Sequence, residues 1–132
     1  MKSSGCCLVN EYGEVLLVLE RWSPTGIKKF GLPKGRREKR DPDLLTTALR
    51  ELKEETGIVL DDINPVSVHV SEYAKTFVFF VKKNDIKYIR QEKEITSIFW
   101  EPLPELKLKY TRNERRYNAP FRRFFESYLI KL

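Results

Sequence analysis

The sequence has 132 residues but only two cysteines and one histidine. The cysteines, Cys6 and Cys7, are adjacent. Neighbouring side chains of a strand point to opposite faces, so we predict no disulfide between them. Two adjacent thiols and the distant His69 also lack the spacing of zinc ligands. The sequence therefore argues against a disulfide scaffold and a zinc centre, and it fits a reducing compartment.

Long hydrophobic runs are also missing. No apolar stretch approaches the roughly 20 residues that a membrane-spanning helix requires. The first residues, MKSSG, lack the apolar segment and cleavage site of a secretory signal. We therefore expect a cytoplasmic protein without a membrane span. The length is typical of one domain, residues 1–132, with its own hydrophobic core.

Acidic residues are outnumbered by basic ones. Lysine and arginine number 25 against 19 aspartates and glutamates, which gives a formal net charge of +6. A basic chain attracts anionic partners such as phosphates, nucleic acid or acidic headgroups. A well-solvated surface has the same composition, so charge alone leaves both interpretations open.

Hydrophobic patterning predicts strands interspersed with helices, which indicates an α/β or α+β class. A helix is expected at about 44–56, capped by Asp43 and closed by Gly57. We expect Pro102 and Pro104 to flank a turn, and Pro120 to kink or divide the last helix. Thr111 and Glu114 form a capping-box pattern for that helix. Strands are expected at 6–9, 14–21, 63–72, 74–82 and 95–100, and the last helix at about 112–129.

Three glutamates of the first helix fall on one side of it. Glu51, Glu54 and Glu55 have the spacing i, i+3, i+4. Clustered anions repel one another and destabilise a helix unless something offsets their charge. Mg²⁺ does so well, because it takes oxygen ligands and keeps positions for substrate phosphates. Arg50 lies four residues before Glu54 and is placed to steady the Glu54 carboxylate, without itself binding the metal. The alternative is a solvated acidic face with one Arg–Glu pair.

This segment resembles the Nudix box, whose pattern is G-x5-E-x7-R-E-U-x-E-E-x-G-U, with U an aliphatic residue. Gly35, within the sequence LPKG, matches the opening glycine. The resemblance extends from the preceding strand through the strand that contains Phe77 to about residue 106. It implies a Nudix-type α/β/α sandwich, a mixed β-sheet flanked by the box helix and a C-terminal helix. The second half of the box is matched by Arg50, Glu51, Leu52, Glu54, Glu55, Gly57 and Ile58.

The loop of the box departs from the pattern. It has one residue too many between Gly35 and Arg50. The position of the loop glutamate therefore falls on Asp41 when counted forward from Gly35, and on Pro42 when counted back from Arg50, and neither is a glutamate. Either Asp41 or Asp43 is expected to substitute. Loops absorb such insertions at little cost. The departure puts the loop glutamate's supporting role in question, not the three glutamates of the helix.

The resemblance implies a metal-dependent hydrolase. Glu51, Glu54 and Glu55 would hold Mg²⁺, or alternatively Mn²⁺, against the substrate's phosphates, and the metal would activate water. Glu54, Glu55 and Arg50 are thus the catalytic candidates on the helix. A further acidic residue is expected in the loop before the last strand, as metal ligand or general base. Glu94 fits best and Glu92 second, and the alternative is an ordinary loop carboxylate.

Cations near the box are candidates for phosphate binding. Arginine forks suit phosphate groups, and Lys75 leads into the strand that usually faces the Nudix cleft. A solvated loop is the alternative. The residues predicted to bind substrate are Lys34, Arg36, Arg37, Arg40 and Lys75.

A second basic cluster, between Arg112 and Arg123, is interleaved with Tyr110, Tyr117 and Phe121. Such segments bind single-stranded nucleic acid, although aromatic residues at helical spacing are more often core. Trp22, Tyr73 and Phe77 have the same two interpretations, base stacking or core packing. His69 is interpreted as an ordinary strand histidine.

Three functions follow. The first is hydrolysis of a phosphoanhydride bond in a nucleotide-based polyphosphate, such as a dinucleoside polyphosphate or the capped 5′ end of RNA. The second is hydrolysis of an inositol pyrophosphate, whose dense charge suits residues 36–40. The third is a non-catalytic module that binds RNA or a protein, and its expected signature, loss of the glutamates, is not found. The sequence leaves open whether the chain is a monomer or a homodimer.

Overall fold

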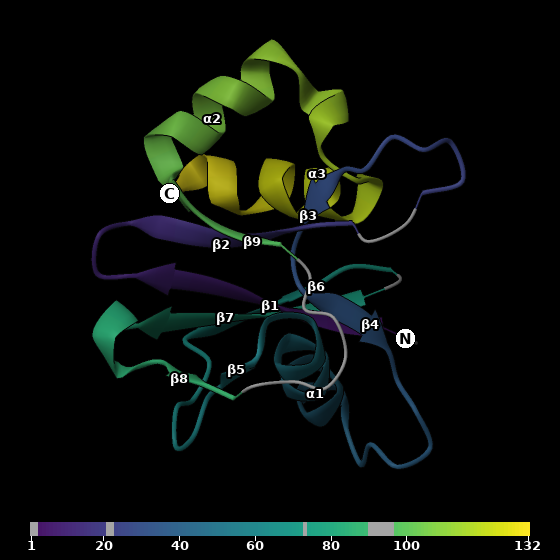
Figure 1. Cartoon of the computed structure of the whole chain (residues 1–132), viewed down its shortest axis with the longest axis vertical. Coiled ribbons are helices and arrows are strands. Elements are labelled where there is room, and N and C mark those ends of the chain that lie inside the picture. The colour runs from purple at the N-terminus through teal and green to yellow at the C-terminus, as the bar shows by residue number, and fades with distance from the viewer. Residues whose placement is uncertain (1–2, 21–22, 73, 90–96) are drawn as a thin grey trace.

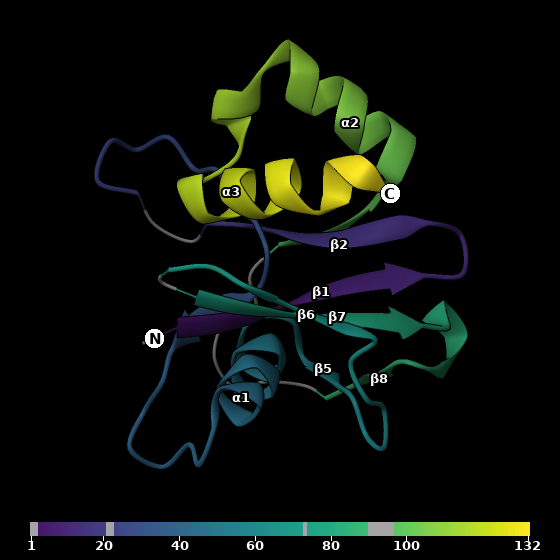
Figure 2. The same cartoon turned by 180° about the vertical axis from the view of Figure 1, so that it is seen from behind.

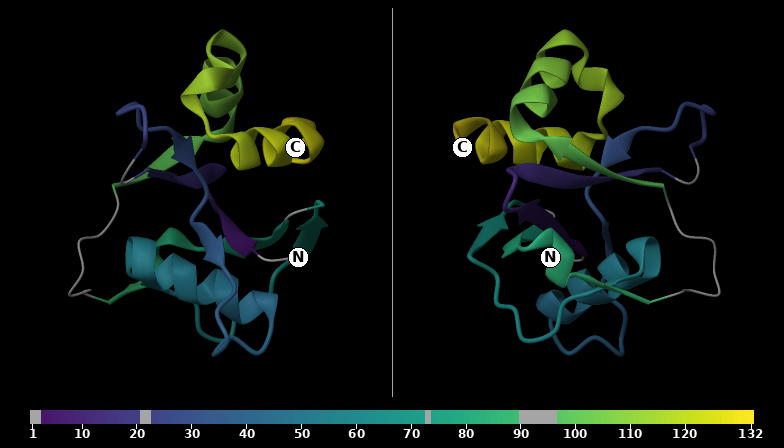
Figure 3. Two further views of the ribbon diagram at one scale, coloured as in Figure 1. Left: turned by 90° about the vertical axis from the view of Figure 1, so that its right-hand side faces the viewer. Right: turned by 60° about the vertical axis from the view of Figure 1, so that its left-hand side comes forward.

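The chain folds into an α/β/α sandwich. A mixed β-sheet lies between one helix on one face and two helices on the other (Figures 1 and 2), and the side views of Figure 3 show the same layers. The predicted α/β class with two flanking helical layers is therefore confirmed. The computed structural model describes residues 3–20, 23–72, 74–89 and 97–132. The helices are α1 (Leu44–Thr56), α2 (Leu103–Arg112) and α3 (Ala119–Ser127).

Within the described residues, seven strands form one sheet with the order β3-β2-β1-β7-β6, while β4 pairs with β1 and β9 pairs with β2. Strand β1 runs parallel to β7 and antiparallel to β2. It pairs with β2 only at the hairpin end, so β4 takes the remaining edge of β1. This arrangement carries β4 to the α1 side of the sandwich. The strands are β1 (Ser3–Asn10), β2 (Glu14–Leu19), β3 (Phe30–Gly31), β4 (Lys34–Arg36), β5 (Ile58–Val59), β6 (Ser67–Val70), β7 (Ala74–Val81), β8 (Lys87–Tyr88) and β9 (Ile98–Pro102).

The central strands are apolar on both faces, which gives the molecule two hydrophobic clusters. Cys7 and Val78 pack with the residues of α2 and α3, whereas Cys6 and Phe77 pack with those of α1. The adjacent cysteines thus point to opposite faces, as the strand pattern predicted, and both thiols are buried. Phe77 is a core residue in this arrangement.

Helix α1 has the predicted bounds and both predicted ends. The Asp43 carboxylate accepts a hydrogen bond from the Thr46 amide at 2.8 Å, which satisfies a donor of the first turn. Gly57 closes the helix with a φ of 78°, a left-handed conformation that favours glycine. The buried face, centred on Ala48 and Leu52, packs against the sheet.

The C-terminal prediction is partly wrong. Helix α2 ends at Arg112, where the predicted helix was to begin, and α3 begins at Ala119. The capping box is not formed, because the Thr111 hydroxyl donates to the Lys107 carbonyl within α2. Asn118 caps α3 instead, and Pro120 lies in the first turn, where its missing N–H costs nothing. The proline thus starts a separate helix rather than kinking one.

Pro102 and Pro104 do not flank a turn, which corrects a second prediction. Pro102 ends β9 and precedes α2, and Pro104 lies in the first turn of that helix. The strand predicted at 63–72 is shorter in the structure, where β6 spans Ser67–Val70. The strand predicted at 14–21 ends at Leu19. The start of the strand predicted at 95–100 lies outside the described residues.

No helix in the described part of the chain is both long and apolar enough to span a membrane.

Candidate active site

The glutamates of α1 lie against strand β4. The backbone amide of Lys34 donates to Glu55 Oε2 at 3.1 Å. At the next residue, Gly35, a β-carbon would collide with the carboxylate of Glu51. Glycine at this position therefore lets the Glu51 carboxylate lie against β4, which gives the opening glycine of the box a physical reason. Strand and helix together fix two of the three predicted metal ligands.

Two of these carboxylates are poorly suited to carrying negative charge in the protein alone. Burial raises the pKa of Glu55 to about 8, and the neighbouring Glu51 raises it further against the hydrogen bond from Lys34. Burial also raises the pKa of Glu51, although Arg50 opposes the shift. Oxygen ligands with uncompensated charge suit a hard divalent cation such as Mg²⁺. The donor chemistry of the pair therefore fits the expected metal.

Glu54 is held differently. Its carboxylate accepts from Arg50 Nη1 at 3.2 Å and pairs with Arg40 at 3.4 Å. Among the residues that the structure describes, no three His, Cys, Asp or Glu side chains are arranged to hold a metal ion together. Glu54 is the most exposed of the three glutamates, so its side chain is free to rotate towards the other two once it leaves the arginines.

Asp41, not Asp43, is the loop residue that contacts Arg50. The Asp41 side chain is only 2% exposed and accepts from Arg50 Nη2 at 2.9 Å and Nε at 3.1 Å. The amide of Glu38 and the hydroxyl of Thr47 also donate to it. The Arg50 guanidinium and these donors hold the pKa of Asp41 well below its usual range. Asp43 is occupied as the cap of α1.

Arg50 joins this loop to the glutamate-bearing face of the helix. Besides Asp41, its guanidinium contacts Glu51 Oε1 at 3.0 Å and the Arg36 carbonyl at 3.0 Å. The side chain is 13% exposed, so these contacts are largely shielded from water. A buried guanidinium with this many acceptors orients the glutamates around it. Arg50 is a positioning residue in this geometry.

The predicted phosphate-binding cations are divided among different places. Arg37 donates to the carbonyls of Asp41 and Pro42, and Arg40 pairs with Glu38 and Glu54. Both are therefore engaged in holding the loop. The Arg36 side chain is exposed to solvent. Lys34 and Lys75 instead line a cavity beside β4, so the structure does not gather the five cations in one patch.

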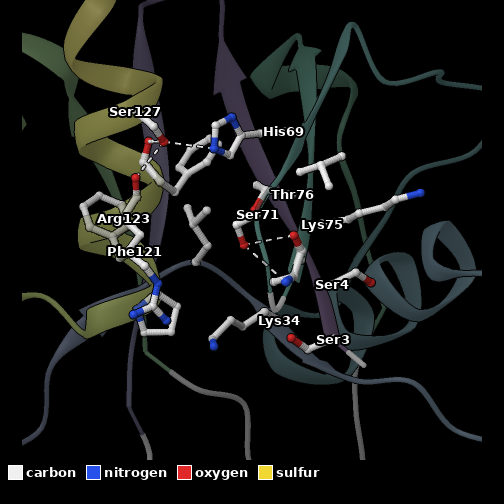
Figure 4. Close-up of a pocket in the computed structure, with 16 residues that line it drawn as sticks. Ser3, Ser4, Lys34, His69, Ser71, Lys75, Thr76, Phe121, Arg123 and Ser127 are labelled. Atoms are coloured by element: carbon white, nitrogen blue, oxygen red, sulfur yellow. Dashed lines mark hydrogen bonds between the residues drawn. The ribbon is translucent and has the colours of Figure 1, made fainter. Parts of the chain in front are cut away.

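That cavity, of about 420 Å³, lies between the sheet and α3 (Figure 4). Lys34 and Arg123 enter it from β4 and α3 respectively. Burial lowers the pKa of Lys34, the charge of Arg123 lowers it further, and Glu55 opposes both effects. His69 also lines the cavity, and its Nε2 lies 2.9 Å from the Ser127 hydroxyl. That hydroxyl is 2.7 Å from the Arg123 carbonyl, to which it donates.

Sequence reasoning missed the cavity role of His69 and Arg123. Register with β7 decides which strand residues face α3, and the sequence did not specify that register. Tyr110, Tyr117 and Phe121 are buried in the cluster beneath α2 and α3, which supports the core interpretation over base stacking. Glu92, Glu94, Trp22 and Tyr73 lie outside the described residues.

Comparison with known proteins identifies the family. The NUDIX domain model matches residues 1–123. No curated protein matches the chain.

Solved structures share the fold at low sequence identity. A NUDIX hydrolase from Nitrosomonas europaea has a TM-score of 0.64 and 16% identity, with 96% of this chain and 86% of that chain covered. An Ap4A hydrolase from C. elegans has a TM-score of 0.59 and 18% identity, covering 98% and 99%. The NUDIX domain of NrtR from Shewanella oneidensis, complexed with ADP ribose, has a TM-score of 0.55 and 22% identity, covering 86% of each. Together with the glutamate-bearing helix and its glycine contact, the domain match places this chain in the Nudix family of pyrophosphohydrolases.

Proposed function

We propose that this protein hydrolyses a phosphoanhydride bond in a nucleotide-based polyphosphate with the help of Mg²⁺. The observation that carries the proposal is the half-buried pair Glu51 and Glu55, which contacts β4 beside a cavity lined by cations. Carboxylates for a metal and cations for phosphates thus adjoin one another. Two similar structures support a nucleotide substrate, since one is an Ap4A hydrolase and another holds ADP ribose.

Glu51, Glu54 and Glu55 are the proposed metal ligands. Mg²⁺, with Mn²⁺ as the alternative, would lower the pKa of the water bound to it and would neutralise negative charge on the leaving phosphate. A similar structure from Francisella tularensis contains a Mn ion with AMP. In the protein itself, Arg50 keeps Glu51 in place, and the Lys34 amide orients Glu55. Glu94, outside the described residues, is proposed as the general base.

Substrate binding is assigned to the cations nearest the carboxylates. Lys34 extends into the cavity, and Arg36 is exposed at the end of β4. Lys75 also lines the cavity, but its ammonium group points away from it (Figure 4). Arg37 and Arg40 would have to exchange contacts within the loop for contacts with phosphate. This reduces the case for an inositol pyrophosphate, which rested on all the cations of residues 36–40.

The test compares wild type with the Glu54→Gln/Glu55→Gln variant in Mg²⁺. Substrates are nucleoside triphosphates, diadenosine polyphosphates, ADP-ribose, an inositol pyrophosphate and a short capped RNA, with products identified by mass. We expect cleavage of a nucleotide compound, reduced at least about 100-fold in the variant. Glu105→Gln, an exposed glutamate in the first turn of α2, is the control and should keep full activity.

Cleavage of the inositol compound alone would replace the nucleotide assignment. A folded wild type that cleaves no compound with Mg²⁺ or Mn²⁺ would refute the enzymatic function. RNA binding would then be measured directly, including its dependence on salt, because contacts with many phosphates weaken steeply as salt rises.

A further inference from the structure

Two cations, Lys34 and Arg123, face each other across the cavity. The nearby charges of Glu55 and Glu20 act on Lys34 without an ion pair in the described residues. Lys34 projects from β4 and Arg123 from α3, and Figure 4 shows their side chains extending towards the same part of the cavity. Within the described part of the chain, neither the Lys34 ammonium nor the Arg123 guanidinium makes a hydrogen bond or an ion pair. Like charges held together repel, so an anion between them would be bound favourably.

The position of this pair relative to the metal ligands is set by the backbone. The Lys34 amide touches Glu55 at 3.1 Å, while the side chain of the same residue enters the cavity. A phosphate between Lys34 and Arg123 would therefore adjoin a phosphate held at Glu51 and Glu55. This adjacency points to one polyphosphate chain that spans both places.

The rest of the cavity suits the organic end of such a molecule. Phe121 and Phe124 form an apolar wall on α3, and His69 and Ser71 offer polar groups from the opposite side. Its volume of about 420 Å³ is within the range of small-molecule sites. Going from α1 into the cavity, the carboxylates of α1 come first and the Lys34 and Arg123 cations second. The part of the cavity lined by both apolar and polar side chains comes last.

We propose that Lys34 and Arg123 together bind a phosphate one step along the chain from the phosphates at Glu51 and Glu55, and thereby select substrates with three or more consecutive phosphates over diphosphates. The inference rests on the proposed function and deepens it. Arginine offers a bidentate fork and lysine a compact point charge, so the pair surrounds a phosphate from two walls. A diphosphate held at the carboxylates has no phosphate left for this position.

The first experiment measures kcat/KM of wild type, Lys34→Gln and Arg123→Gln on diadenosine tetraphosphate and on ADP-ribose, a diphosphate. The glutamine at position 34 keeps the backbone amide that contacts Glu55. Each substitution should lower kcat/KM on the tetraphosphate about tenfold or more, and change it less than about threefold on ADP-ribose. Arg115→Gln removes an exposed charge away from the cavity and should leave both values unchanged. Equal losses on both substrates, or no loss, would overturn the proposal.

A binding measurement separates this proposal from the enzymatic one. Calorimetry without metal should show inorganic triphosphate binding wild type and Arg115→Gln equally, and each cavity variant at least about fivefold more weakly. If wild type cleaves nothing but shows this pattern, the paired cations bind phosphate and the hydrolase assignment fails. If triphosphate does not bind, or binds all variants alike, the paired-cation proposal fails whatever the activity.

Discussion

Gly35 is the residue at which sequence and site are most tightly connected. The helix supplies Glu51, but the space for its carboxylate exists only because position 35 has no side chain. Arg50 contributes in a similar way, since its guanidinium contacts both Asp41 and Glu51. The absence of a side chain at Gly35 and the guanidinium of Arg50 therefore decide where the Glu51 carboxylate lies.

Gly35→Ala should weaken Mg²⁺ binding about tenfold, because the added methyl group displaces the Glu51 carboxylate. The displaced group ends a flexible side chain, so the free energy of unfolding should change by about 1 kcal/mol or less. Mg²⁺ titration by calorimetry and urea unfolding measure the two effects. On a Glu51→Gln background the same substitution should have no further effect on Mg²⁺ affinity. Unchanged Mg²⁺ affinity in the single variant would show that Glu51 is not a ligand.

Helix α3 begins at a cap, Asn118, that lies outside the capping box expected at Thr111 and Glu114. The Asn118 side chain accepts from the Phe121 amide at 3.0 Å, and the backbone amide of Asn118 donates to the Phe30 carbonyl. A side chain at Gly31 would collide with Asn118, so β3 and the start of α3 are fitted to one another. This contact fixes the helix that carries Arg123 into the cavity.

Asn118→Ala should destabilise the protein by about 1 kcal/mol, because a donor of the first turn loses its acceptor. Asn118→Asp preserves the acceptor and should recover most of the loss. Chemical denaturation of the three proteins gives the comparison. A loss as large in Asn118→Asp as in Asn118→Ala would contradict the capping role, because aspartate keeps both the acceptor and the shape of the side chain.

At the scale of the whole molecule, the site is assembled from parts that are distant in sequence. Strand β4 is placed beside α1 because β1 and β2 separate beyond their hairpin. The cavity forms where α3 crosses the β1, β7 and β6 part of the sheet. The Asp41–Arg50 pair then ties the intervening loop to the helix.

Asp41 should give the protein a specific loss of stability in acid. Because Arg50 lowers its folded pKa below the ordinary value of 3.8, the pair stabilises the fold above about pH 4. That stability is lost as the pH falls through the lower folded value. Asp41→Asn should therefore reduce the melting temperature by about 8 °C at pH 7. The difference from wild type should shrink towards pH 2.

Thermal unfolding followed by circular dichroism from pH 7 to pH 2 provides the measurement. Asp85→Asn, at an exposed aspartate in the short helical turn Lys83–Asp85, is the control with the same change of charge and should keep the wild-type melting temperature. A constant difference between Asp41→Asn and wild type across this range would contradict the expected role of the Asp41 charge.

From the amino-acid sequence alone one can predict the family, helix α1 with both its ends, and the three glutamates on one side of that helix. These features depend on local spacing and on residues with strong conformational preferences, such as Asp43 and Gly57. The division of the C-terminal segment was not recovered, because Thr111 offered a plausible cap and only packing selected Asn118.

Tertiary structure decided which residues share the site. Asp41 rather than Asp43 meets Arg50 because the loop folds back over α1. Arg37 and Arg40 are used within the loop, whereas Arg123, far away in sequence, reaches the cavity beside Lys34. Local sequence fixes which way a side chain points from its own helix or strand. Which side chains meet depends on strand pairing and layer packing, and these are set by contacts between distant segments.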